Sequence, residues 1–125
     1  MISLSWKFDG TTPLFQQVAN RVRADILNKK YLPDEQLPSV RQFAFEASVN
    51  PNTMQKALSL LEAEGLLYTK GTAGRFVTSD PSTIECARSA HRRLIMHNVI
   101  KEASEAGVSA HELLKYIKEE YGYDS

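Results

Sequence analysis

A polar stripe of side chains at helical spacing brings together amide, hydroxyl and ammonium groups, which can hydrogen-bond to the bases and phosphates of a nucleic acid. At about 100° per residue, one stripe of a helix collects Asn52, Gln55, Lys56 and Ser59. The opposite, apolar stripe consists of Met54, Ala57, Leu58 and Leu61. Asn and Gln can pair with adenine through two hydrogen bonds, and a Lys ammonium reaches guanine or a phosphate. Amphipathic surface helices generally have a polar face, so the neighbouring segments must decide what this stripe does.

The segments before this stripe predict two short helices joined by a tight turn. Asn50 is expected to cap the helix that holds the stripe, with Pro51 at its first position and Gly65 as its stop. A shorter helix is predicted over residues 40–47, in which Ser39 caps and Gln42 reaches back as a capping box.

Arg41 lies in the first turn of the shorter helix, where free backbone N–H groups favour an anion. It is a candidate phosphate anchor or base contact. The alternative is a surface salt bridge with Glu46 or Glu35.

A β-hairpin is predicted directly after the polar-striped helix, with strands at 66–69 and 75–78. Its tip contains Gly71 and Gly74, which permit positive φ and a close backbone approach. Lys70 and Arg75 flank the tip and can hold phosphates or enter a narrow minor groove. The alternative is an ordinary hairpin with solvated charges. Helix, tight turn, helix and hairpin together describe a winged helix-turn-helix.

The remaining segments frame this unit. Residues 2–8 alternate apolar and polar side chains, which predicts a short strand. A first helix is expected from a Thr12 cap and Pro13 to about Lys29–Lys30, and residues 31–38 form a connector. Beyond Pro81, helices are predicted over about 82–105 and from a capping box at Ser109 to about Tyr121.

The expected fold is mainly α with a small β-hairpin wing. Residues 1–80 form the winged helix-turn-helix DNA-binding domain, and residues 81–125 form a two-helix dimerisation tail.

The tail holds more apolar side chains than two helices can bury against each other, so a second copy of the chain is the natural cover. The residues expected to form that homodimer contact are Leu94, Ile95, Val99, Leu113, Leu114 and Ile117.

Composition limits the other functions. The net charge is zero, with nine basic and eight acidic residues in 1–80, so weak non-specific DNA binding is expected. No metal or cofactor is expected, because His91 and His97 lie about 240° apart on a helix and lack a third ligand. No catalytic motif suggests an enzyme. The single cysteine, Cys86, and the lack of a signal peptide or a membrane-length apolar run favour the cytoplasm.

Residues 13–78 resemble the DNA-binding domain of the GntR family of bacterial regulators. The matching segments, in the family's order, are Pro13–Val18, Leu37–Arg41, Val49–Met54, Leu61–Leu67 and Gly74–Val77. The resemblance implies a two-fold dimer on a palindromic operator. Its implied DNA-contacting positions are Arg41, Asn50, Asn52, Thr53, Gln55, Gly71 and Gly74. With the residues derived above, the candidate DNA-binding set is Ser39, Arg41, Asn50, Asn52, Thr53, Gln55, Lys56, Lys70, Gly71, Gly74 and Arg75.

This chain departs from the family pattern at two places. Many members carry Arg where this chain has Pro51, and some carry Arg at the place of Gln55, so readout here shifts toward amides. The wing reads Gly-Thr-Ala-Gly rather than Gly-x-Gly.

The short tail is similar to that of YtrA-type members, which implies a repressor and admits a small-molecule effector. The alternative function is a winged-helix protein-interaction module without DNA readout. Such modules tend to expose apolar side chains where this chain has Asn, Gln, Lys and Ser.

Overall fold

The computed structural model describes residues 6–122, which form five helices and one two-stranded antiparallel sheet. The predicted fold class, mainly α with a hairpin wing, is confirmed. The elements are α1 (Leu14–Leu27), α2 (Val40–Ala47), α3 (Pro51–Ala63), β1 (Leu67–Lys70), β2 (Gly74–Val77), α4 (Pro81–Glu105) and α5 (Ala110–Tyr121). The chain divides into two compact units, Met1–Arg88 and Ser89–Ser125. The first turns of α4, residues 81–88, belong to the first unit.

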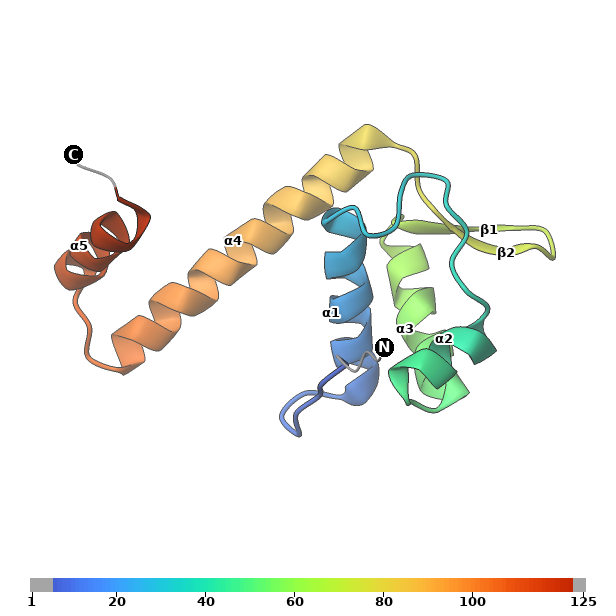
Figure 1. The fold of residues 1–125 in the computed structure, drawn as a ribbon, viewed down its shortest axis with the longest axis horizontal. Helices are drawn as coiled ribbons and strands as arrows, with labels where there is room; N and C mark the ends of the chain where they lie inside the picture. Colours follow the sequence, from blue (N-terminus) through green and yellow to red (C-terminus); the bar gives the residue numbers. More distant parts are fainter. Residues whose placement is uncertain (1–5, 123–125) are drawn as a thin grey trace. The chain divides into compact units, whose positions relative to one another are not determined.

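The core of the first unit lies among α1, α2 and α3, with α1 and α3 side by side (Figure 1). Phe43 of α2 is 1% exposed, and its ring packs edge to face with Trp6 and Tyr31 at centroid distances of 5.9 and 6.2 Å. The core side chains follow helical spacing along α1 and α3. They include Val18, Val22 and Ile26 of α1 and Met54, Leu58 and Leu61 of α3.

The ends of α1 differ from the prediction. Thr12 does not cap the helix, because Pro13 takes the N-cap position and its carbonyl accepts from Gln16 N and Gln17 N. The helix stops at Leu27, two residues before the predicted end. Lys29 has a positive φ of 64°, and the N–H of Lys30 turns back to Asp25 O.

The predicted N-terminal strand covers residues 2–8, of which residues 2–5 lie outside the described residues. Residues 6–8 are described, and they are irregular. Trp6 and Phe8 are nevertheless partly buried against the core. The Arg21 guanidinium lies 4.4 Å from the Trp6 ring centroid. At Trp6 and Phe8 the alternation therefore coincides with apolar packing on helices, and a strand over residues 2–5 stays a prediction.

The hairpin pairs Leu67 with Val77 and Lys70 with Gly74, so each strand starts one residue away from its predicted start. The connector before α2 also bonds to β2. Leu37 N donates to Arg75 O at 2.9 Å, and Val77 N donates to Glu35 O at 2.9 Å. These two hydrogen bonds hold β2 of the wing to the connector that precedes α2.

The second unit holds the rest of α4, a turn and α5. Gly107 has φ 84° after α4, and Ser109 forms the predicted capping box with Glu112. Among residues 6–122, no helix combines the length and the apolar character needed to cross a membrane.

We expect Phe43→Ala to lower the free energy of unfolding by about 3–5 kcal/mol, because it removes a buried ring and leaves a cavity. Phe45→Ala, in the same helix but at an 81% exposed position, is the matched control and should change it by less than about 0.5 kcal/mol. Urea unfolding followed by circular dichroism measures both. Equal losses would contradict this description of the core.

Candidate nucleic-acid interface

The two stripes of α3 lie as predicted. Asn52, Gln55, Lys56 and Ser59 are exposed. Met54, Ala57, Leu58 and Leu61 are at most 1% exposed. Burial of the apolar stripe fixes the rotation of α3 about its axis, so the amide, hydroxyl and ammonium groups face solvent.

The start of α3 is fixed by the predicted cap. Asn50 Oδ1 accepts from Asn52 N at 2.7 Å, and Pro51 occupies the first turn. Ser48 adopts the left-handed conformation (φ 58°) in the turn that separates α2 from α3. The cap uses the amide oxygen of Asn50 and leaves its NH2 group for a ligand. Thr53, in the first turn, is half-buried.

The start of α2 presents a second group of polar residues. Ser39 Oγ accepts from Gln42 N at 3.1 Å, which confirms the cap. The Gln42 side chain does not reach back, because it donates to Glu46 Oε2 at 3.1 Å. Arg41 is exposed, and within residues 6–122 it forms no ion pair with Glu46 or Glu35. Its guanidinium is thus available at a helix N-terminus, where a phosphate would also meet backbone N–H groups.

Lys56 and Lys70 each lie near an aromatic ring. Lys56 Nζ lies 4.2 Å from the ring centroid of Phe15 in α1. Lys70 Nζ lies 5.9 Å from the ring centroid of Phe76 in the wing. Both side chains belong to exposed residues, so each ammonium is oriented by a ring and still accessible to an anion.

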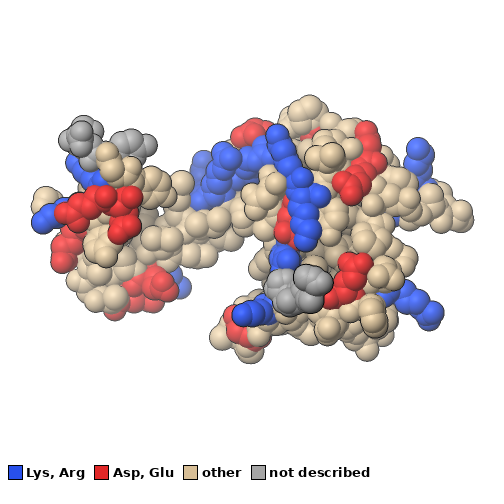
Figure 2. Space-filling model, in the orientation of Figure 1, with Lys and Arg blue, Asp and Glu red and all other residues tan. Residues whose placement is uncertain are grey.

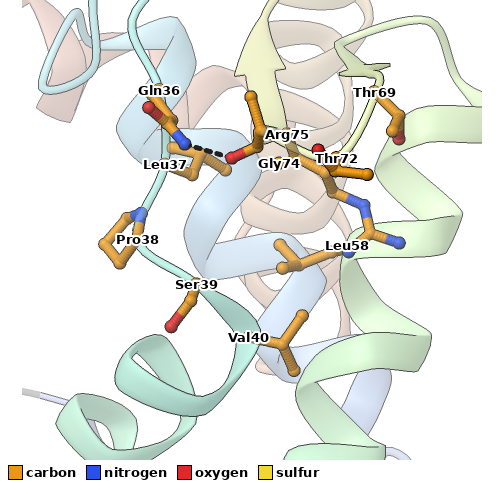
Figure 3. A pocket seen from close by; sticks show the side chains of 11 residues that line it. Gln36, Leu37, Pro38, Ser39, Val40, Leu58, Thr69, Thr72, Gly74 and Arg75 are labelled. Atoms are coloured by element: carbon orange, nitrogen blue, oxygen red, sulfur yellow. Dashed lines mark hydrogen bonds between the residues drawn. The ribbon is translucent and has the colours of Figure 1, made fainter.

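Arg75 turns from β2 toward α3, as Figure 3 shows, instead of extending from the wing tip. Its Nε donates to Glu62 Oε1 at 3.0 Å. Its two terminal nitrogens approach Gln55 Oε1 at 3.4 Å and Ser59 Oγ at 3.3 Å. This guanidinium therefore connects the wing to the polar stripe of α3.

Glu62 anchors that connection. It accepts from Thr69 Oγ1 at 2.7 Å as well as from Arg75. The hydrogen bond from Thr69, followed by the one from Arg75, lowers the pKa of Glu62 below its ordinary value. Sequence reasoning did not identify Glu62 or Thr69, because their partners are distant along the chain and no spacing rule connects them.

The wing tip is tied to the connector before α2. Gln36 Nε2 donates to Ala73 O (Figure 3). Gly71 and Gly74 have φ values of 54° and 126°, as their type predicted. A Cβ at Gly74 would lie 3.1 Å from Gln36 Nε2. Gln36 is a second residue that sequence reasoning missed, again because its contact is long-range.

A pocket of about 350 Å³ opens between the wing, the connector and the start of α2. Gln36, Ser39, Thr72 and Arg75 contribute polar groups to it, and Leu37, Val40 and Leu58 contribute apolar walls. The pocket thus adjoins both the cap of α2 and the wing.

Charge is mixed rather than segregated over the first unit. On the face drawn in Figure 2, Lys and Arg side chains alternate with Asp and Glu side chains. This agrees with the near-zero balance of the sequence. Within residues 6–122, no three His, Cys, Asp or Glu side chains are grouped so that they could hold a metal ion.

The second unit exposes most of the apolar side chains expected in a dimer contact. Leu94, Ile95 and Val99 of α4 are 57%, 48% and 50% exposed. Leu114 and Ile117 of α5 are 59% and 40% exposed, and Leu113 is half-buried.

Comparison with known proteins agrees with this geometry. Residues 14–77 match the family model described as bacterial regulatory proteins of the gntR family. The chain is 31% identical over 111 residues to the HTH-type transcriptional repressor YtrA of Bacillus subtilis, covering 87% of this chain and 85% of the repressor.

Solved structures show the same fold. A GntR family transcriptional regulator from Listeria monocytogenes superposes with a TM-score of 0.80 at 28% identity, covering 90% of this chain and 98% of that one. The DNA-binding domain of AraR, in complex with operator ORX1, superposes with a TM-score of 0.57 at 29% identity, covering 62% of this chain and 100% of that one.

We expect the stability that Glu62 contributes to depend on pH. Its pKa is lower in the folded protein than its ordinary value of 4.5, so the contribution is present above about pH 4.5 and is lost as pH falls through the folded pKa. At pH 7 the wild type should have a higher melting temperature than Glu62→Gln. The difference should correspond to a free energy of unfolding of at most about 1 kcal/mol. The two should converge once the pH is below the folded pKa of Glu62. Glu102→Gln, which alters an exposed carboxylate of α4, is the control. A difference that stays constant with pH would contradict the role of the Glu62 charge.

Proposed function

The chain belongs to the GntR family of bacterial regulatory proteins, and from that premise we propose that it represses transcription as a homodimer bound to a palindromic operator. The family makes it a DNA-binding transcriptional regulator, not an enzyme. Three parts of the proposal go beyond the family assignment, namely the repressor role, the two-fold assembly and the residues that contact DNA. Since a bacterial operator lies in the cytoplasm, the proposal places the protein there.

The observation that carries the proposal is the exposed polar stripe of α3. Its apolar stripe is buried, so Asn52, Gln55 and Lys56 are free to enter a major groove. A winged helix that binds another protein through α3 is expected to expose apolar side chains at these positions. The AraR domain in its operator complex has the same fold, which supports DNA as the ligand here.

The remaining candidates take supporting positions around the groove. Ser39 and Arg41 at the start of α2 would receive a phosphate, because backbone N–H groups and a guanidinium meet there. Asn50 and Thr53 would contact DNA from the first turn of α3. Lys70, Gly71 and Gly74 of the wing would approach an adjacent groove or its backbone.

Repression follows from analogy with YtrA, a repressor by name. A small-molecule effector enters the proposal as a modulator of operator affinity.

Dimerisation is assigned to the second unit. Apolar side chains of α4 and α5 lie four residues apart in the pairs Ile95–Val99 and Leu113–Ile117, so each pair occupies one helix face. Ile95, Val99 and Ile117 are exposed, and Leu113 is half-buried. An isologous contact between two such units would remove these side chains from water. Its two-fold axis would match the axis of a palindromic operator.

We expect the full-length protein to select a palindrome from a pool of random duplexes. Sequencing of the retained DNA should show half-sites whose centres are separated by about 10 base pairs or a multiple of that turn. Arg41→Ala should weaken binding to this sequence by about tenfold or more, because a charge-assisted phosphate contact is lost. Glu119→Ala, which lies far along the sequence from the proposed DNA contacts, is the control. Retention without any enriched sequence would contradict the proposal.

A dimer variant tests the second unit independently. Ile117→Glu places a charge in the proposed contact and should convert a species of twice the chain mass into a monomer in sedimentation equilibrium, with operator affinity reduced at least tenfold. Lys118→Glu changes charge at the adjacent position and is the matched control. A wild-type protein that sediments as a monomer on DNA would overturn the two-fold assembly.

A further inference from the structure

We propose that Arg75 sets the base preference of Gln55. By donating to the amide oxygen of Gln55, Arg75 fixes the orientation of the amide and takes one of the two lone pairs of that oxygen. The NH2 group is then the better-placed group for a base edge, so Gln55 selects guanine over adenine in the operator. The inference rests on the proposed function, because it concerns the operator sequence that α3 reads.

The chemistry of the guanidinium fixes the orientation of the Gln55 amide. A guanidinium donates hydrogen bonds and accepts none, so the Gln55 atom that faces Arg75 must be the oxygen. That oxygen lies 3.4 Å from Arg75 Nη1, and Ser59 Oγ lies 3.3 Å from Arg75 Nη2. The Gln55 NH2 group lies at the longer distance of 3.5 Å from Ser59 Oγ, which leaves at least one of its hydrogens for DNA.

Arg75 is in place before DNA arrives. Arg75 Nε donates a hydrogen bond to Glu62 Oε1 at 3.0 Å, and the backbone carbonyl of Arg75 accepts one from Leu37 N at 2.9 Å. The Arg75 side chain is 16% exposed, less than the 34% of Glu62. A partly buried, planar guanidinium with three side-chain partners loses little freedom on complex formation. It therefore acts as a positioning residue, not as a mobile phosphate contact.

The major-groove edges of the two purines respond differently to such a side chain. A Gln with both groups free accepts from adenine N6 and donates to adenine N7. When Arg75 donates to the oxygen, the adenine amino group must use the second lone pair in the orientation that Arg75 fixes, so it meets a poorer acceptor. A poorly paired donor at a dry interface is costly. Guanine displays two acceptors, O6 and N7, and both suit an NH2 group.

The test compares operators selected from random duplexes by full-length wild type and four variants. Gln55→Met identifies the position that Gln55 reads, because the preference there should disappear. Arg75→Met removes the guanidinium. Arg75→Lys keeps a cation for Glu62 but lacks the planar fork that reaches Gln55 and Ser59. Lys70→Met removes a wing cation outside this network and is the control, and thermal melting of each variant verifies its fold.

At the position read by Gln55, wild type should prefer guanine to adenine by about tenfold in affinity. Both Arg75 variants should shift the preference toward adenine, and if Arg75→Met does not fold, Arg75→Lys decides. Lys70→Met should weaken all sequences alike.

Three results would overturn the inference. They are adenine as the wild-type preference, an unchanged preference in the Arg75 variants, and a loss in those variants that is uniform across sequences, as a phosphate contact would give. Failure of wild type to enrich any sequence would instead overturn the proposed function, and this inference with it.

Discussion

Burial of the apolar stripe of α3 against α1 is the interaction on which the DNA-facing surface depends. Met54, Ala57, Leu58 and Leu61 are almost fully buried, and removing any of the larger ones would cost both apolar transfer and packing free energy. Because side chains recur every 3.6 residues along a helix, this burial leaves one rotation available to α3. Asn52, Gln55 and Lys56 then face outward without needing any interaction of their own.

The wing and the connector add a second constraint, which acts on individual side chains. Backbone bonds from residues 34–37 to β2 hold the hairpin beside α3. The Arg75–Glu62 ion pair also joins β2 to α3. An ion pair that is still partly open to solvent contributes little to stability, but a forked guanidinium also orients the groups that it contacts. The connection between wing and helix thus bears more on what Gln55 can donate or accept than on the stability of the fold.

Most local features were predictable from the sequence, apart from the Thr12 cap and the return contact of Gln42, and long-range contacts were not. Ser39, Asn50 and Ser109 cap helices where their type and position indicated, because capping depends on neighbours two or three residues away. The positive φ values of Gly71 and Gly74 follow in the same way. At residues 6–8, the described part of the N-terminal alternation, the strand prediction was wrong, because packing of Trp6 on Phe43 and pairing in a sheet produce similar patterns.

The candidate site shows the same division. The polar stripe of α3 could be derived from spacing alone, and the structure places it on the surface. The partners of Arg75 and the Gln36 contact with the wing join residues 13 to 37 positions apart, which no periodic pattern encodes. The near-zero charge of the first unit is consistent with recognition that relies on a few placed groups rather than on general attraction to phosphates.

The most direct test of α3 as the DNA-reading surface is a two-dimensional NMR titration of the isotope-labelled full chain with a short duplex carrying its selected operator. The account predicts that backbone amide signals of residues 39–42, 50–56 and 70–74 shift first and most. Those of residues 94–100 and 113–117, in the proposed dimer contact, should stay nearly unchanged. Shifts confined to the second unit, with the signals of α3 unaltered at saturating DNA, would contradict the account.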